Sequence, residues 1–203
     1  MNISLGVDVG STTAKIVVLR ENTPVFSRYT RHYSQIRDTI MTMLGDAADE
    51  LKKLSIPADT PVSVAMSGSA GMGLAEAAGI PFVQEVWATG QVVRRLEPDT
   101  DAVIELGGED AKILFFGDSV DERMNGACAG GTGAFSDQMA TLLAMTPDEL
   151  DAASLHYEKL YPIASRCGVF AKSDVQPLLN QGARKEDVAA SIYQAVVNQT
   201  ISG

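Results

Sequence analysis

The pattern of apolar and polar positions contains the same unit twice. Residues 3–8 and 14–19 are apolar runs that flank the polar turn Val9-Gly10-Ser11-Thr12-Thr13, and residues 102–106 and 111–116 flank Gly107-Gly108-Glu109-Asp110. Short apolar runs bounded by turn residues predict strands, so each set predicts a hairpin. Both second strands begin with Ala-Lys-Ile, at residues 14–16 and 111–113. This internal repeat predicts two related domains, 1–97 and 98–203, joined at residues 98–100.

The rest of the pattern alternates between helices and strands. Apolar residues at helical spacing predict a long amphipathic helix over residues 36–54 and a last helix over 187–201. We also expect strands over 24–30, 61–66 and 120–124, and helices over 73–78, 86–96, 135–143, a short one capped by Thr146, and 175–180 after Ser173-Asp174. The predicted fold class is therefore α/β. Because the chain ends directly after an amphipathic helix, we expect it to be a truncated part of a longer protein.

The two turns carry residue types that bind phosphate and metal. Asp8 ends a strand, where a carboxylate can hold a hydrated Mg²⁺, and residues 10–13 offer N–H and O–H groups to phosphate oxygens. A plain polar hairpin is the alternative for one such turn. The repeat favours a clamp in which two acid-and-glycine turns face each other across a cleft and hold a nucleotide's phosphates and its metal.

A third segment, Met124 to Phe135, reads MNGACAGGTGAF and combines a thiol with a glycine-rich turn. Cys128 precedes Gly130, Gly131, Thr132 and Gly133, and a helical pattern follows. The start of a helix is the positive end of its dipole, which favours a thiolate and anionic ligands. Glycines let backbone N–H groups approach a phosphate closely. The segment can therefore serve a nucleotide, a metal centre or both.

The chain's two cysteines, Cys128 and Cys167, are 39 residues apart. That spacing is not a zinc motif, and His32 and His156 lie in unrelated contexts. An iron–sulfur cluster usually needs four thiolates, which a two-fold dimer would supply. Two buried structural cysteines are the alternative. Both residues lie in loops that precede helices, which is a setting for ligands or reactive thiols.

Composition narrows the class of protein. The chain has 203 residues and a net charge of −10, which disfavours a general nucleic-acid surface. No apolar run is long enough to span a membrane, and the first residues do not form a signal peptide. With two cysteines there is no disulfide framework, so we expect a cytoplasmic protein that contacts neither nucleic acid nor membrane.

Four motifs in this order, GVDVGSTTAK, IELGGEDAKI, MNGACAGGTGAF and SRCGVFAKSDV, resemble the activator (activase) component of 2-hydroxyacyl-CoA dehydratases. That group is related to the ATPase subunits of benzoyl-CoA reductase and belongs to the actin, sugar-kinase and chaperone ATPase superfamily. The resemblance runs from Ile3 to the last helix. It implies duplicated ribonuclease-H-like domains, with an adenine-binding loop and a closing helix that would follow residue 203.

The resemblance also implies a function. An activator of this kind is a homodimer that binds ATP or ADP with Mg²⁺ and shares one four-iron, four-sulfur (4Fe-4S) cluster, here through Cys128 and Cys167 of each subunit. It hydrolyses ATP and delivers one low-potential electron to a 2-hydroxyacyl-CoA dehydratase or a related CoA-ester reductase. Ferredoxin or flavodoxin is the implied electron donor.

Residue roles follow from the matched motifs. Asp8 and Glu105 are expected near the hydrated Mg²⁺, while Glu109 or Asp110 would orient the attacking water or the metal. The expected nucleotide-binding residues are Gly10, Ser11, Thr12, Thr13, Lys15, Gly107, Gly108, Gly130, Gly131, Thr132 and Gly133. The second turn departs from the family: it opens with Glu105 where Asp is usual, and it has Glu109 where Gln is usual.

Two other functions remain open at this point. A sugar or N-acetylhexosamine kinase of the same superfamily would need a general base for its substrate, and none of the remaining aspartates is convincing. A non-catalytic, nucleotide-gated scaffold would use both cysteines as ordinary core residues.

Overall fold

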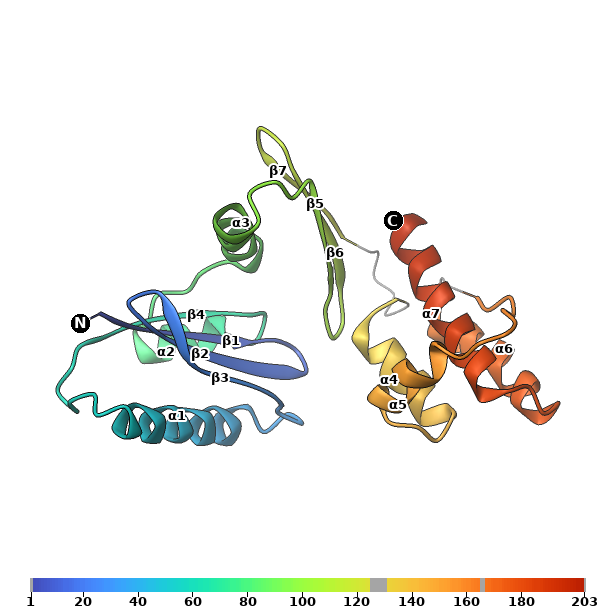
Figure 1. Cartoon of the computed structure of the whole chain (residues 1–203), viewed down its shortest axis with the longest axis horizontal. Coiled ribbons are helices and arrows are strands. Elements are labelled where there is room, and N and C mark those ends of the chain that lie inside the picture. The colour runs from blue at the N-terminus through green and yellow to red at the C-terminus, as the bar shows by residue number, and fades with distance from the viewer. Residues whose placement is uncertain (1, 125–130, 165–166, 203) are drawn as a thin grey trace. The chain divides into compact units, whose positions relative to one another are not determined.

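The computed structural model describes residues 2–124, 131–164 and 167–202 (Figure 1). The chain divides into two compact units, Met1–Asp99 (unit 1) and Thr100–Gly203 (unit 2). Both units combine a β-sheet with helices, so the predicted α/β class is confirmed.

Unit 1 is a four-stranded sheet in the order β3-β2-β1-β4, with β4 parallel to β1 and the other pairs antiparallel. Figure 1 shows α1 lying along one face of this sheet. The strands are β1 (Ile3–Val9), β2 (Thr13–Arg20), β3 (Thr23–Arg31) and β4 (Val62–Ser67), and the helices are α1 (Ile36–Lys53), α2 (Met72–Ala78) and α3 (Glu85–Leu96).

The core of unit 1 lies between α1 and the sheet. Ile40, Met43 and Ala47 follow one another at helical spacing and are buried against strand residues such as Ile3 and Ile16. This is the face that the apolar spacing of residues 36–54 predicted. Its burial fixes the sheet, and with it the ends of β1, β2 and β4, where the first turn lies.

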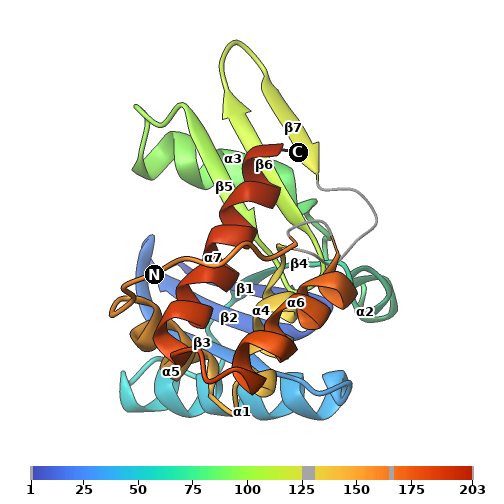
Figure 2. The same ribbon diagram turned by 90° about the vertical axis from the view of Figure 1, so that its right-hand side faces the viewer.

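Unit 2 begins with an antiparallel three-stranded sheet in the order β5-β6-β7, followed by four helices among the described residues. Its strands are β5 (Ala102–Leu106), β6 (Ala111–Phe116) and β7 (Val120–Met124), with the bounds that the apolar pattern predicted. Its helices are α4 (Gly133–Leu142), α5 (Pro147–Ser154), α6 (Gly168–Asn180) and α7 (Lys185–Ser202). Figure 2 views these helices from the side on which α6 and α7 are nearest.

The helices of unit 2 share one hydrophobic core. Phe135 and Met139 from α4 pack with Leu150 from α5 and with Val188 and Ile192 from α7. Apolar positions about a turn apart in each helix account for this cluster. The core therefore fixes the direction in which α4 enters the helical part of the unit.

Two helix starts show how local hydrogen bonds set the boundaries. Thr146 caps α5 with a full capping box, since its Oγ accepts the Glu149 N–H and the Glu149 carboxylate accepts the Thr146 N–H, so the predicted cap is confirmed. The predicted start of α6 at Ser173 is wrong. Ser173 lies inside the helix, where its Oγ donates to the Val169 carbonyl, and the helix begins at Gly168.

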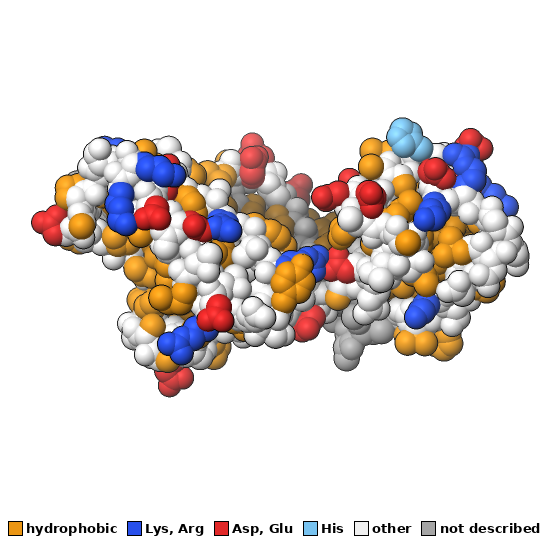
Figure 3. Space-filling model, turned by 90° about the horizontal axis from the view of Figure 1, so that it is seen from below, with side chains coloured by type: hydrophobic (Ala, Val, Ile, Leu, Met, Phe, Trp, Pro, Cys, Tyr) orange, Lys and Arg blue, Asp and Glu red, His pale blue; other side chains and the backbone are white. Residues whose placement is uncertain are grey.

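Among the described residues, none of the helices combines the length and the hydrophobicity that crossing a bilayer requires. On the face shown in Figure 3, acidic and basic side chains lie interspersed among apolar ones.

Candidate functional site

The two repeated turns have the same backbone frame. In turn 1 (residues 10–13) the Gly10 N–H donates to the Thr13 carbonyl over 2.9 Å. In turn 2 (residues 107–110) the Gly107 N–H donates to the Asp110 carbonyl over 2.7 Å. Two residues therefore form the tip of each hairpin, 11–12 in one and 108–109 in the other. The sequence repeat is thus a repeat of local structure.

Each turn has an acid and a lysine facing each other at its base. The strand register pairs Asp8 with Lys15 and Glu105 with Lys112. Lys15 Nζ donates to Asp8 Oδ1 over 2.8 Å, whereas Lys112 Nζ lies 3.9 Å from Glu105 Oε1 and 3.6 Å from Asp110 Oδ2. Opposite charges at facing strand positions stabilise the pair. The first pair is tight and partly open to solvent; in the second, the lysine is buried.

Asp8 has a further partner that the sequence analysis missed. Ser67, the last residue of β4, donates its Oγ to Asp8 Oδ2 over 2.9 Å. Because β4 runs parallel to β1, the carboxyl ends of both strands meet at one edge and bring Ser67 beside Asp8. The available signal was that a Ser-Gly pair ends a strand. Asp8 thus has both oxygens bound, while 28% of its side chain stays exposed to reach a ligand.

The loop after β4 closes tightly on the end of β1. Gly68 has φ +95°, and a Cβ at this position would lie 2.2 Å from the Val9 carbonyl oxygen. Ala70 donates its N–H to the same carbonyl over 2.9 Å. Only glycine fits so close to the Val9 backbone. Turn 1 is therefore attached to the body of unit 1 through the strand that precedes it.

Turn 2 is attached instead to the start of α4. The N–H groups of Gly133 and Ala134 donate to the carbonyls of Gly107 and Gly108, over 2.8 Å and 2.9 Å. A Cβ on Gly133 would lie 3.2 Å from the Gly107 oxygen, so glycine permits this close approach. These two amides belong to the first turn of α4, whose N–H groups have no partner inside the helix. Turn 2 supplies the partners.

The glycine-rich segment before α4 is only partly described. Thr132 is 1% exposed and caps α4, since its Oγ1 accepts the Phe135 N–H over 3.5 Å. Gly131 has φ +84° and lies against the Gln199 side chain. The predicted phosphate donors here are thus engaged in part with the protein, because the Gly133 N–H binds turn 2. Cys128 and Gly130 lie outside the described residues.

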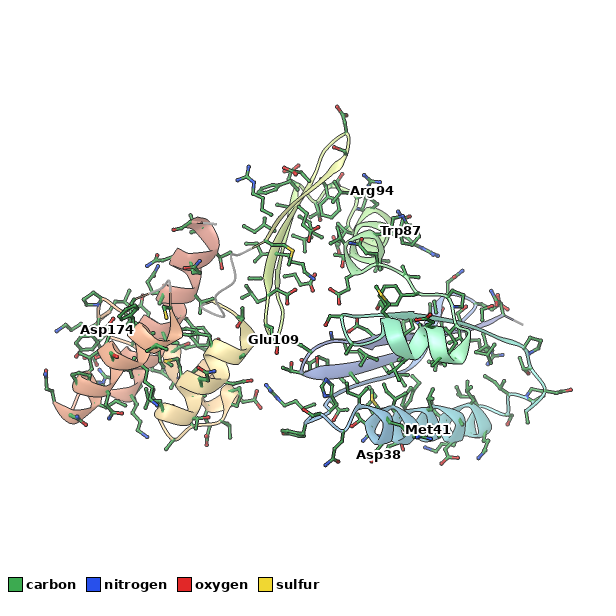
Figure 4. The ribbon with its side chains drawn as sticks, turned by 180° about the vertical axis from the view of Figure 1, so that it is seen from behind. Asp38, Met41, Trp87, Arg94, Glu109 and Asp174 are labelled. Atoms are coloured by element: carbon green, nitrogen blue, oxygen red, sulfur yellow. The ribbon has the colours of Figure 1, made fainter. Side chains whose placement is uncertain are left out.

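Cys167 lies at the N-cap of α6 and is half-buried. Two carboxylates bind backbone N–H groups of residues 158–164, which precede it in the chain. Asp174, labelled on α6 in Figure 4, accepts the Ala164 N–H over 2.8 Å. Asp187 accepts the N–H groups of Glu158 and Lys159, and the bond from Glu158 is the main reason that the pKa of Asp187 is lowered.

The remaining predicted acids differ in exposure. Glu109 is exposed at the tip of the β5–β6 hairpin, as Figure 4 shows, while Glu105 and Asp110 are partly exposed at its base. In the described part of the chain, no group of three or more His, Cys, Asp and Glu side chains is arranged to hold a metal ion. The predicted acids therefore form two sets: Asp8 lies at turn 1, and Glu105, Glu109 and Asp110 lie at turn 2.

Comparison with known proteins shows relatives that match almost the whole chain. A 2-hydroxyisocaproyl-CoA dehydratase activator of Clostridioides difficile is 29% identical, over 98% of this chain and 74% of the relative. The (R)-2-hydroxyglutaryl-CoA dehydratase activating ATPase of Acidaminococcus fermentans is also 29% identical, over 98% of this chain and 75% of the relative.

A solved structure, the activator of the 2-hydroxyisocaproyl-CoA dehydratase from Clostridium difficile with bound ADPNP, has 27% identity. Its TM-score is 0.85, over 98% of this chain and 74% of that chain, so the predicted ATPase fold is confirmed. Residues 5–202 match the BadF/BadG/BcrA/BcrD ATPase family. The match covers both turns and all the helices, and the chain therefore belongs to the BadF/BadG/BcrA/BcrD ATPase family.

Proposed function

We propose that this protein is an ATP-hydrolysing activator of a 2-hydroxyacyl-CoA dehydratase or a related CoA-ester reductase. It converts ATP and water to ADP and phosphate, accepts one electron from reduced ferredoxin or flavodoxin, and passes that electron to the dehydratase at low potential. The observation that carries the proposal is the hydrogen bond from the Gly133 N–H to the Gly107 carbonyl, because it joins turn 2 to the helix that follows the Cys128 segment. The similarity to a dehydratase activator and to a dehydratase activating ATPase supports the same activity.

In this proposal the two turns bind the phosphates. Ser11 and Thr12 in turn 1 and Gly108 in turn 2 offer backbone N–H groups, because the N–H groups of Gly10 and Gly107 close the turns. The hydroxyls of turn 1 add donors, and Lys15 adds a positive charge. Asp8 holds the hydrated Mg²⁺, which suits a carboxylate that Lys15 and Ser67 already orient. Glu105 contributes at the metal from turn 2, and Glu109 or Asp110 orients the attacking water.

The two cysteine thiolates of each chain fit an iron–sulfur cluster that two subunits share. Cys167 begins a helix, where the dipole favours a thiolate. Next to it, Val169 and Phe170 are 73% and 66% exposed, an apolar surface of the kind that a subunit interface covers. Cys128 and Cys167 of two copies would hold a 4Fe-4S cluster, which supplies one-electron redox chemistry when bound.

In this proposal, ATP hydrolysis is coupled to electron transfer through a short structural connection between turn 2 and the segment that carries Cys128. Any change in turn 2 as ATP becomes ADP alters the carbonyls of Gly107 and Gly108, and these bind the first turn of α4. The chain that enters α4 carries Cys128 five residues earlier than Gly133. Nucleotide state then biases the position of a cluster ligand without a long relay.

The proposal is tested by anaerobic purification with iron and sulfide analysis. We expect four irons and four sulfides per dimer, and loss of both in Cys128→Ser and Cys167→Ser. Ser173→Ala is the matched control, because Ser173 is exposed on the same helix as Cys167 and its hydroxyl bonds only within that helix in the described structure. This control should keep the iron and the dimer.

Two results would contradict the proposal. A protein that hydrolyses ATP but stays free of iron after anaerobic reconstitution would exclude electron transfer while leaving the ATPase in place. Phosphorylation of a sugar by ATP would instead identify a kinase. Reduction of the dehydratase by the reduced activator, only in the presence of hydrolysable ATP, is the expected positive result.

A further inference from the structure

Turn 1 and turn 2 differ in what binds the carbonyl of their first glycine. At turn 2 the Gly107 carbonyl accepts the Gly133 N–H from α4. At turn 1 the equivalent Gly10 carbonyl lies 3.0 Å from Nε2 of His32. We infer that His32 is a positioning residue for the phosphate-binding turn 1. It holds the carbonyl of the first glycine of turn 1, as the start of α4 holds that of turn 2. The inference rests on the proposed nucleotide binding, and nothing in the sequence motifs indicated it.

His32 directly follows β3 and is 4% exposed. Its Nδ1 accepts the Ser34 N–H over 3.1 Å. A backbone N–H can only donate, so Nδ1 carries no proton, and the neutral ring carries its proton on Nε2. The imidazole therefore donates through Nε2 to the Gly10 carbonyl. With both ring nitrogens engaged with backbone groups, the ring serves the turn rather than a metal.

The backbone around His32 adds a second link and fixes the ring. The His32 N–H donates to the Thr12 carbonyl over 3.2 Å, so the residue binds two carbonyls of turn 1. Tyr33 and Ser34 then adopt positive φ values, 46° and 63°. Such conformations are strained for residues other than glycine and persist where the surrounding structure holds them. This local fold places the Ser34 N–H against Nδ1 and so fixes the ring's tautomer and direction.

Fixing the Gly10 carbonyl also fixes a phosphate donor. A trans peptide is planar, with its C=O and N–H pointing in opposite directions. When His32 holds the Gly10 carbonyl on one side, the Ser11 N–H of the same peptide is directed to the other side. A donor that is oriented before the ligand arrives stabilises the bound phosphate without further ordering. His32 thereby acts on the nucleotide through the turn and without touching it.

Two substitutions separate the roles of the two ring nitrogens. His32→Gln places an amide N–H near the position of Nε2 and can still donate to Gly10. His32→Asn places an amide oxygen near the position of Nδ1 and keeps only the acceptor for Ser34. The probe is Mg·ADPNP, whose dissociation constant is measured by calorimetry for each variant. His156, which is exposed in unit 2, receives the same two substitutions as a matched control.

We expect His32→Asn to weaken binding of Mg·ADPNP by about tenfold or more, the size of a lost oriented hydrogen bond. His32→Gln should stay within about threefold of the natural protein, and both His156 variants should bind normally. Exchange of the Gly10 amide, which donates to Thr13, should be faster in His32→Asn than in His32→Gln. Equal binding by both His32 variants, with equal exchange of the Gly10 amide, would overturn the inference.

The exchange measurement keeps this test separate from the proposed function. If the natural protein does not bind Mg·ADPNP at all, the proposed nucleotide binding is wrong. The exchange rate of the Gly10 amide in the two His32 variants then still shows whether His32 holds turn 1. Nitrogen NMR of the imidazole gives a further check that needs no ligand. The inference requires the tautomer with the proton on Nε2, and a ring protonated on Nδ1 would contradict it.

Discussion

Turn 1 and turn 2 have the same hydrogen-bonded tip and the same facing acid and lysine, yet they are attached to different kinds of structure. Turn 1 is held by the body of unit 1, through His32, Ser67 and the close approach of Gly68. Turn 2 is held by the start of a helix whose preceding segment carries Cys128. A repeated motif can therefore serve two uses within one chain. In the proposed function, the first turn fixes the phosphates and the second transmits their state.

The largest effect is expected on the rate of ATP hydrolysis when the acids at the bases of the two turns are replaced. Asp8→Asn should lower the rate of ATP hydrolysis by about 100-fold, because the amide removes the charge that, in the proposed function, holds hydrated Mg²⁺. Glu105→Gln should lower the rate of hydrolysis by only about tenfold, because the Asp110 carboxylate beside Lys112 keeps a negative charge at turn 2. Steady-state hydrolysis across a Mg²⁺ titration measures both, with Asp118→Asn in the exposed β6–β7 loop as control. Equal losses at Asp8 and Glu105 would mean that the turns share the metal evenly.

The next largest effect is expected on the free energy of unfolding when the glycines through which the two turns are attached, Gly68 and Gly133, are replaced. Gly68→Ala should cost about 3 kcal/mol of the free energy of unfolding, because its Cβ would overlap the Val9 backbone at a positive φ. Gly133→Ala should cost about 1 kcal/mol or less, since the 3.2 Å contact with Gly107 can relax by a small shift. Gly73→Ala on α2, where the Cβ meets open space, is the control. Urea unfolding gives all three values, and a larger loss at Gly133 than at Gly68 would reverse the comparison.

A smaller effect tests whether the cap of α4 supports turn 2. Thr132→Val removes the hydroxyl that accepts the Phe135 N–H and should cost about 1 kcal/mol. Thr146→Val removes the cap of α5 in the same unit at a similar cost. Hydrogen exchange at Gly133 and Ala134 should be faster only in Thr132→Val. Similar exchange in both variants would show that the start of α4 does not depend on its own cap.

The smallest effect is a pH dependence of unit 2. Backbone N–H groups lower the pKa of Asp187 below its ordinary value of 3.8, so its contribution to stability is fully present above that pH. The contribution is lost as pH falls through the folded-state pKa. Asp187→Asn should therefore flatten the loss of stability of unit 2 below pH 3.8. Asp49→Asn, at an exposed ion pair with Lys52 in unit 1, is the control and should change little.

An acid titration of the unfolding free energy, followed by amide signals from each unit, measures this effect. An unchanged acid dependence of unit 2 in Asp187→Asn would show that this carboxylate does not hold the loop before Cys167.

Much of the fold could be predicted from local pattern. The strands on either side of turn 2 have the predicted bounds, because apolar runs end where glycine and acidic residues begin. The start of α6 was mispredicted because Ser173 resembles a cap in the sequence, while its hydroxyl in fact bonds to Val169 one turn earlier. Whether such a hydroxyl caps a helix or bonds within it depends on the backbone before it, which the sequence pattern does not reveal.

The site was predictable only in part, for the same kind of reason. The acids, glycines and lysines of both turns could be named because the repeat places them at equal spacing. Ser67 and His32 could not, since neither belongs to a motif and each acts through hydrogen bonds to a segment that is distant in the sequence. The sequence context of His32 indicates no metal site, and its contact with the Gly10 carbonyl becomes visible only in the structure.

The two turns follow from local sequence alone, because their defining bond joins residues three positions apart, Gly10 to Thr13 and Gly107 to Asp110. Short loops of this kind close at little cost in entropy and need no distant partner. The contacts that hold each turn depend on long-range packing. The contacts of His32 with Gly10 and of Ser67 with Asp8 span 22 and 59 residues. They form only after a buried helix and a strand register have brought those segments together.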